Sequence, residues 1–257
     1  MPEQTIPKRI LKEMKYISDQ QGIMNRYFAE SKGWNEHLKI SRSFILENIS
    51  RRNPETVMIM GSGWLLDVPL DELVSMCKQV YLADIHHPPQ VRQKVKKIKN
   101  ARLISADISG GAVMQVYQLV KGYKKDKVMR SLDTILPEPP DLPAADYLVS
   151  LNLLNQLDIL LVDYIKRYIL YPEDEITRFR KRIQEHHLSI LKPGASCLIT
   201  DIKELIINRK KEVHQEKQLI HVHLPEGRSG KSWIWKFDRK EYNPRFDTNM
   251  EVIAIEL

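Results

Sequence analysis

Residues 57–64 read Val-Met-Ile-Met-Gly-Ser-Gly-Trp, and residues 80–84 read Val-Tyr-Leu-Ala-Asp. Between them, residues 70–79 carry apolar side chains at the spacing of an amphipathic helix. The pattern predicts a buried strand, a Gly-x-Gly turn, a helix and a second strand that ends on an acid. Such a unit is typical of nucleotide binding, because glycines let the backbone bend beside a ligand and a carboxylate can accept both hydroxyls of a ribose.

The turn departs from the Gly-x-Gly-x-x-Gly fingerprint of dinucleotide-binding proteins. Leu66 stands where the third glycine would allow close packing of helix on strand. Asp84 nevertheless follows Gly61 at close to the roughly 20-residue spacing of that fingerprint. An ordinary tight turn in an α/β sheet is the alternative to a ligand-binding turn.

The remaining chain extends this unit into a larger sheet. Further strands are predicted at residues 101–107, 145–152 and 196–201, and helices at 90–99, 112–123, 157–170 and 177–191. Asp107 lies as far beyond Asp84 as Asp84 lies beyond Gly61, which suggests successive turns at one carboxyl edge of a parallel sheet. Extended segments at 218–224, 232–237 and 251–257 follow. The predicted fold class is α/β: a Rossmann-like, mostly parallel seven-stranded sheet with an antiparallel C-terminal hairpin and a helical N-terminal cap.

The segment before the first strand looks helical and defines a predicted boundary. Residues 1–52 are interpreted as the cap, and residues 53–257 as the Rossmann-like domain. Within the cap, Trp34 and His37 lie close together and could line a pocket. The alternative is a packed cap in which the histidine is simply hydrogen-bonded.

Length and composition set broad limits on the class of protein. The 257 residues suffice for a sizeable core, and 42% of them are hydrophobic, as in ordinary globular proteins. Cys77 and Cys197 form no close-spaced pair, so neither a disulfide framework nor a thiolate metal site is indicated. His221 and His223 would share a strand face but lack a third ligand at recognisable spacing, and no metal is predicted. The absence of a long apolar run or a signal-peptide core predicts a cytoplasmic protein without membrane contact.

A net charge of +7 is concentrated in basic clusters. They cover residues 94–102, 121–130, 178–182 and 209–211. Such clusters could bind nucleic-acid phosphates weakly, or could simply form the solvated faces of helices. A basic nucleic-acid-binding protein that has this fold but catalyses no reaction is therefore the second functional hypothesis.

The order of these elements resembles the class I S-adenosylmethionine-dependent methyltransferases, as an atypical member. The resemblance is carried by residues 57–63, Ala83-Asp84, Ala106-Asp107 and the Leu-Lys-Pro-Gly-Ala turn at 191–195, and it extends from residue 57 to the C-terminus. The class implies S-adenosylmethionine as the cofactor and a methyl acceptor as the partner. A nicotinamide-dependent oxidoreductase is disfavoured by Leu66 and by the antiparallel tail.

The resemblance also implies roles for individual residues. Gly61 and Gly63 would let the backbone pass the methionine part of the cofactor, Asp84 would bind the ribose hydroxyls, and Asp107 the adenine amine. The other residues assigned to cofactor binding are Ser62, Trp64, Ile85, Ile108 and Asn152.

The acceptor and the catalytic residues are not identified by sequence. Asn155 and Gln156, after the fourth strand, are candidates for substrate binding together with Trp34 and His37; amides at that position could equally cap the following helix. Residues 150–154 differ from the Asn/Asp-Pro-Pro-Tyr sequence of amino-methylating members, which weighs against a nucleic-acid base or an amide as acceptor.

Overall fold

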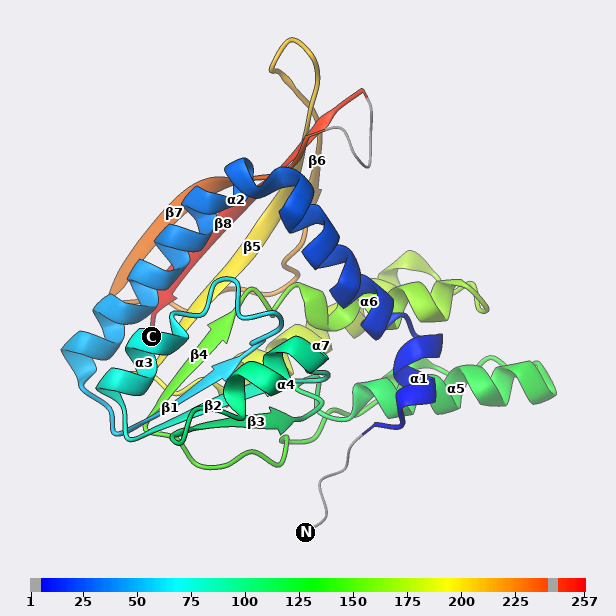
Figure 1. Ribbon diagram of the computed structural model, residues 1–257. Coiled ribbons are helices and arrows are strands. Elements are labelled where there is room, and N and C mark those ends of the chain that lie inside the picture. The colour runs from blue at the N-terminus through cyan, green and yellow to red at the C-terminus, as the bar shows by residue number, and fades with distance from the viewer. Residues whose placement is uncertain (1–5, 240–244) are drawn as a thin grey trace.

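The computed structural model describes residues 6–239 and 245–257. These residues form a single eight-stranded sheet with helices on both faces (Figure 1). Five strands run parallel in the order β3-β2-β1-β4-β5. They are β1 (Thr56–Met60), β2 (Gln79–Asp84), β3 (Ala101–Ser105), β4 (Tyr147–Leu151) and β5 (Ser196–Ile207). Because β1 lies between β2 and β4, the strand order reverses there, and this is the point at which open α/β sheets bind ligands.

The C-terminal part of the sheet is antiparallel, as predicted. β8 (Asp247–Glu256) lies between β5 and β7 (Ser229–Arg239) and pairs with both. This completes the seven strands of the main path and confirms the predicted fold class. An eighth strand, β6 (Val213–Gln218), pairs with the distal half of β5 and forms with it the arm that projects at the top of Figure 1. β5 is therefore longer than the predicted 196–201.

The extended segment predicted at residues 218–224 was placed too late in the chain. The strand ends at Gln218, and the next residues run as an irregular segment. Their backbone groups are satisfied by a side chain, because Gln184 donates to the Leu219 carbonyl at 3.0 Å and accepts from the His221 N–H at 2.7 Å. A side chain from a helix thus replaces the sheet partner that the sequence pattern suggested.

Two groups of helices cover the sheet. One face carries α3 (Leu70–Met76), α4 (Pro89–Val95) and the second half of α2 (Tyr16–Arg52), while the other carries α1 (Lys8–Glu13), α5 (Ala112–Asp126), α6 (Gln156–Lys166) and α7 (Glu173–Ile190). A short 3-10 helix, η1 (Leu132–Thr134), follows α5. Each face has its own apolar core, and every residue of β4 is buried between the two. Such two-sided burial explains why the central strands read as continuous apolar runs.

Several predicted helices have different ends in the structure. α3 and α4 end early, at Met76 and Val95, and α6 ends at Lys166 rather than near residue 170. α7 begins before the predicted residue 177, directly after Pro172, with three acidic residues in its first turn. Those acids favour the positive end of the helix, and this local signal identifies the true start.

The long helix α2 bends at Glu30, where the backbone leaves helical geometry (φ −116°, ψ 21°). Its second half rests on β7, and the contact is so close that a Cβ atom on Gly33 would lie 2.5 Å from the Lys236 carbonyl oxygen. At the bend, the buried Glu30 carboxylate accepts the backbone N–H and the side-chain Nε–H of Arg239. The first half is thereby directed across the carboxyl ends of the strands (Figure 1). The division of the chain at residues 52 and 53 stays a prediction.

Candidate functional site

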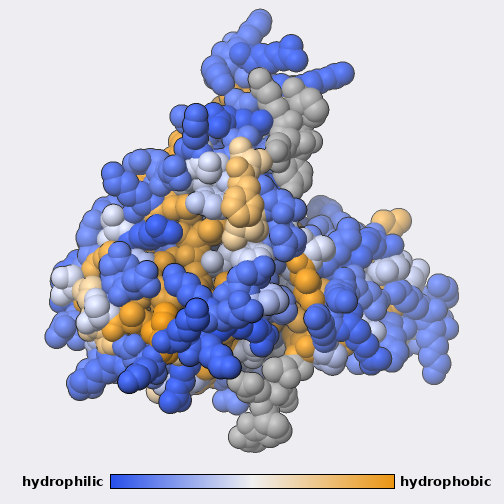
Figure 2. All heavy atoms as spheres, viewed as in Figure 1, coloured by the Kyte–Doolittle hydropathy of each residue, from blue (hydrophilic) through white to orange (hydrophobic). Residues whose placement is uncertain are grey.

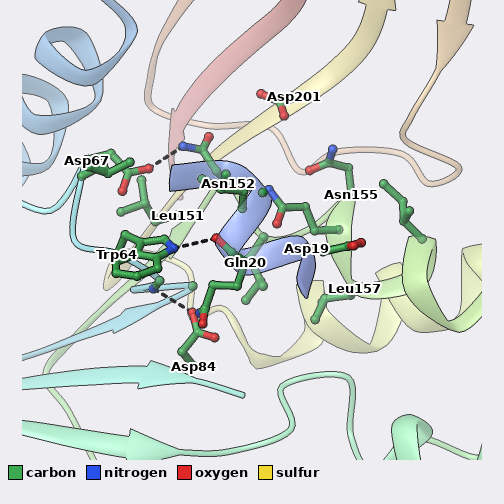
Figure 3. Close-up of a pocket in the computed structure, with 18 of the residues that line it drawn as sticks. Asp19, Gln20, Trp64, Asp67, Asp84, Leu151, Asn152, Asn155, Leu157 and Asp201 are labelled. Atoms are coloured by element: carbon green, nitrogen blue, oxygen red, sulfur yellow. Dashed lines mark hydrogen bonds between the residues drawn. The ribbon is translucent and has the colours of Figure 1, made fainter. Parts of the chain in front are cut away.

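A cavity of about 600 Å³ lies at the carboxyl ends of the central strands, beneath the first half of α2 (Figure 3). Most of the residues assigned to a site from sequence line it together. From the cofactor set these are Gly61, Gly63, Trp64, Asp84, Ile85, Ile108 and Asn152, and from the substrate set Trp34, His37, Asn155 and Gln156. Residues from the N-terminal helix and from four strand ends thus meet at one cavity. Its volume is within the range of small-molecule sites.

The Gly-x-Gly turn forms the cavity wall where β1 ends. Gly61 has φ +87°, and a Cβ atom on it would lie 2.5 Å from the Leu151 carbonyl oxygen at the end of β4. The N–H groups of Gly61 and Ser62 both donate to the Ala83 carbonyl, at 2.9 and 3.2 Å. The turn is therefore fixed to β2 and β4 at once, in a space that only glycine fits.

Asp84 faces the cavity from the tip of β2 and is held by backbone donors. One carboxylate oxygen accepts the Gly63 N–H at 2.7 Å and the other accepts the His86 N–H at 3.3 Å. Burial raises the pKa of this carboxyl above its usual value, and these N–H groups oppose the shift. An ionised carboxylate has about four acceptor positions, so these two N–H groups do not exhaust its capacity to accept hydrogen bonds.

Asp107 and Ser62 lie differently from the rest of the predicted cofactor set. Asp107 lines an adjacent cavity of about 440 Å³, which shares Ile85 and Ala106 with the first. Its carboxylate accepts the backbone N–H groups of Ser109 at 3.0 Å and Val113 at 3.2 Å, and so fixes the loop that precedes α5. Ser62 is buried behind the turn. Asp107 thus lines the second cavity and not the first, and Ser62 is in neither lining.

Asn152 connects two buried polar side chains at the end of β4. Its amide nitrogen lies 2.7 Å from Asp67 Oδ2 and 3.2 Å from His37 Nε2, and its backbone has φ +47°. His37 accepts the indole N–H of Trp233 on Nδ1 at 3.1 Å. Burial lowers the pKa of His37 to about 3, so the imidazole is neutral at physiological pH. Burial raises the pKa of Asp67 to about 6, with the Asn152 amide opposing the shift.

Three acids in the cavity were missed by the sequence analysis: Asp19 on α2, Asp67 and Asp201. Asp67 follows the glycine turn. Asp201 lies in β5 next to a β-bulge, because the pairing of β5 with β8 shifts register between Asp201 and Lys203. Burial raises the pKa of Asp201 to about 7; the Asn155 amide opposes the shift and the charge of Asp67 adds to it. Asp201 ended a predicted strand, just as Asp84 did, and that shared position was the available signal.

Aromatic side chains close the cavity on the side of α2 and β7. Trp34 donates its indole N–H to the Phe237 carbonyl at 2.8 Å, and its ring meets Trp235 edge-on with centroids 4.7 Å apart. His37 stacks on Trp235 at 3.9 Å. Trp34 and His37 are therefore packed and hydrogen-bonded, and they line the cavity as well. Their predicted role in substrate binding stays a prediction.

The first half of α2 is tied to the strand ends by two hydrogen bonds. Trp64 donates its indole N–H to the Gln20 carbonyl at 2.6 Å (Figure 3), and the Gln20 amide donates to the His86 carbonyl at 2.8 Å. Asp19 and Arg26, from the same half of α2, also line the cavity. This segment therefore roofs the cavity and is fastened to the loops that follow β1 and β2.

The basic clusters lie on separate elements rather than around the cavity. They fall on α4 and the start of β3, on the end of α5, on α7 and on the β5–β6 turn. Several of their charges pair with acids, as in Arg130–Asp126, Arg178–Asp174 and Arg182–Asp133. Polar residues cover most of the face shown in Figure 2, with an apolar band through its middle. Nucleic-acid binding stays a prediction.

Two further searches concern metal sites and membrane spans. Within residues 6–239 and 245–257, no group of three or more His, Cys, Asp or Glu side chains is arranged to hold a metal ion. In the same part of the chain, no helix has the length and apolar character needed to cross a membrane.

Solved structures that resemble this chain at low identity include two methyltransferases and a complex with SAH. The N-methyltransferase NodS from Bradyrhizobium japonicum WM9 is 10% identical, with 89% of this chain and 99% of that chain covered and a TM-score of 0.40. A complex of DhpI with SAH is 11% identical, with 96% of each chain covered and a TM-score of 0.38. Precorrin-6y C5,15-methyltransferase from Geobacter metallireducens GS-15 is 12% identical, with 84% and 87% covered and a TM-score of 0.28. No protein-family profile and no curated protein sequence matches the chain.

Proposed function

We propose that this protein is an S-adenosylmethionine-dependent methyltransferase. The observation that carries the proposal is the cavity at the point where the strand order reverses, with the glycine turn of β1 on one side and the Asp84 carboxylate of β2 on the other. A ligand in an open α/β sheet binds at this place, and an acid there suits a ribose. The topology predicted from the resemblance, five parallel strands followed by an antiparallel pair, supports the same assignment.

The residues present fit the cofactor. Gly61 and Gly63 line the cavity where its methionine part would lie, and Asp84 would face the ribose hydroxyls from the tip of β2. The adjoining cavity, lined by Ile85, Ala106 and Asp107, would take the adenine. When bound, S-adenosylmethionine supplies a methyl group already activated on a sulfonium centre.

The charge of the cavity favours a cationic ligand. Its lining contains four acids, Asp19, Asp67, Asp84 and Asp201. Among the described residues, Arg26 is the single Lys or Arg in the lining. A sulfonium ion inside this cavity would meet carboxylates in a medium of low dielectric, where opposite charges attract more strongly than in water. The roof formed by α2 would exclude water from the reacting groups.

Replacement of Asp84 by alanine tests the proposal. Hydrogen bonds to a charged group contribute roughly 1.5–3 kcal/mol each, so Asp84→Ala should weaken the binding of S-adenosylhomocysteine at least about tenfold. Isothermal titration calorimetry measures the affinity, and the product is used because it is not consumed. Asp71→Ala, on the exposed surface of α3, is the matched control and should bind as the wild type does. Unchanged affinity in a folded Asp84→Ala protein would refute the assignment.

A further inference from the structure

The β4–β5 end of the cavity contains buried polar atoms without hydrogen-bond partners. Asp201 is 3% exposed and its Oδ1 atom has no partner among the described residues; the same holds for Asn155, 4% exposed, and its Oδ1 atom. Both residues line the cavity, and Figure 3 shows them close to Asn152, on the side opposite Asp84. Buried acceptors of this kind are costly unless a donor satisfies them. The Oδ1 atoms of Asp201 and Asn155 would therefore be satisfied by a ligand that donates hydrogen bonds.

The two carboxyl groups at this end, those of Asp67 and Asp201, favour a positively charged ligand. Asp67 and Asp201 lie close enough that the negative charge of Asp67 raises the pKa of Asp201. Across residues 6–239 and 245–257, no Lys or Arg nitrogen comes within 4.0 Å of the Asp201 carboxylate, whereas nine-tenths-buried acids elsewhere, such as Asp158 and Glu256, pair with arginines. A positively charged ligand would supply the partner that the protein itself supplies at those other sites.

Aromatic rings form the rest of this wall. Trp34, Trp235 and Phe237 line the cavity near the Asn152–His37 pair. Their faces are already covered in part, because His37 stacks on Trp235 at 3.9 Å, Trp34 stacks on Phe237 at 5.7 Å and the Arg26 guanidinium lies 4.3 Å from the Phe237 ring centroid. The rings therefore form an apolar wall, and the carboxylates favour an ammonium group over a neutral alcohol or a carboxylate.

This acidic end is separate from the proposed ribose position. In the sheet order β2-β1-β4-β5, Asp84 and Asp201 stand three strand spacings apart, which corresponds to about 14 Å. That distance leaves room for one ligand at the β1–β2 end and a second beside β4 and β5. The cavity thus offers two chemically different subsites.

We infer that the β4–β5 end, formed by Asp67, Asp201, Asn155 and the aromatic wall, is the subsite for a protonated aliphatic amine. This inference rests on the proposed function, in which the amine is the methyl acceptor. An aliphatic amine is compatible with the lack of an Asn/Asp-Pro-Pro-Tyr sequence, which weighs only against bases and amides.

The same carboxylates can manage the proton of the amine. An ammonium ion must release a proton before its nitrogen has a free electron pair, and Asp201 is placed to receive it. When the nitrogen attacks the methyl carbon, a carbon–nitrogen bond forms and the methyl–sulfur bond breaks, with its electron pair left on sulfur. The proton passes from the nitrogen to the carboxylate and from there to water, so that charge and atoms balance.

Three probes of the same shape test the inference: benzylamine, benzyl alcohol and benzoate. Titration calorimetry with S-adenosylhomocysteine present should show benzylamine binding at least about tenfold more tightly than benzyl alcohol, with benzoate weakest. Asp201→Asn should remove at least about tenfold of the benzylamine affinity and leave that for benzyl alcohol unchanged. Asp71→Asn, on exposed α3, is the control, and Asp67→Asn replaces Asp201→Asn if the latter does not fold.

The outcomes separate this inference from the proposed function. If S-adenosylhomocysteine binds but benzylamine and benzyl alcohol bind alike, or if benzylamine binding is unaffected in both Asp201→Asn and Asp67→Asn, the amine subsite is wrong and the proposed function stands. If S-adenosylhomocysteine does not bind the wild type, the proposed function fails. Preference for benzylamine that depends on Asp201 would still support a cation subsite in that case.

Discussion

The two ends of the cavity hold their acids in different ways. At the β1–β2 end, both oxygens of Asp84 accept backbone N–H groups from neighbouring loops. At the β4–β5 end, Asp201 has an oxygen without a partner and lies beside another acid. We call the first end backbone-built, because backbone N–H groups fix the position of the Asp84 carboxylate. We call the second end side-chain-built, because it consists of side chains and Asp201 Oδ1 can still accept a hydrogen bond from a ligand. The comparison shows that one cavity can hold one acid with backbone N–H groups and leave another acid to be satisfied by a ligand.

The largest effect is expected where the backbone-built end meets β4. Gly61→Ala would place a Cβ atom 2.5 Å from the Leu151 carbonyl oxygen at a positive φ, and should lower the free energy of unfolding by roughly 3 kcal/mol or more. Gly194→Ala is the matched control, because Gly194 has φ +79° with open space around it. Its backbone strain alone should cost about 1–2 kcal/mol. Urea denaturation measures both, and equal losses would show that the close approach at Gly61 is unimportant.

A second prediction concerns the pH dependence of the side-chain-built end. The pKa of Asp201 rises from 3.8 to about 7 on folding, so the folded state binds the proton more tightly. The resulting stabilisation is complete below pH 4 and is lost as the pH rises through 7. Asp201→Asn cannot ionise, and should therefore gain stability relative to the wild type by roughly 2–4 kcal/mol between pH 4 and pH 8.

The matching substitution at the other end should gain less stability. Burial also raises the pKa of Asp84, so Asp84→Asn removes an unfavourable buried charge, but its new NH₂ group faces a backbone N–H, which costs about 1–3 kcal/mol. Urea denaturation at pH 5 and pH 8 follows both variants. A difference between Asp201→Asn and wild type that does not change with pH would contradict the buried, ionisable state of Asp201.

The smallest effect concerns the roof over both ends. Trp64→Phe removes the indole N–H that donates to the Gln20 carbonyl at 2.6 Å, and should lower the free energy of unfolding by about 1 kcal/mol. Amide hydrogen exchange should become faster in the first half of α2 and stay unchanged in the second half, which rests on β7. Uniform acceleration along the whole helix would show that the two halves do not move independently.

The backbone-built end could be predicted from sequence, because its parts are local. Gly61, Gly63 and Asp84 belong to one strand–turn–helix–strand unit, and their relative positions follow from its geometry. The contacts of the second half of α2 could not be predicted in the same way. Trp34 meets Phe237 across 203 positions of sequence, and no pattern near residue 34 specifies that partner.

The side-chain-built end was missed for a more specific reason. Asp201 was recognised as the last residue of a strand but was not assigned to the site, and β5 in fact continues to Ile207 through a bulge. A bulge redirects side chains without a clear sequence signal. Among the described residues Asp201 has no Lys or Arg nitrogen within 4.0 Å, and this depends on how distant segments pack, which the sequence alone does not show.

The position of β8 between β5 and β7 bears on how the molecule is made. β7 leaves the ribosome before β8, yet it joins the sheet only through β8. α2 leaves the ribosome much earlier, and its second half packs against β7 in the folded protein. During synthesis, the five parallel strands can therefore assemble while α2 still lacks its support, with the long-range pairing left until last. The second half of α2 therefore gains its contact with β7 only when β8 has been translated.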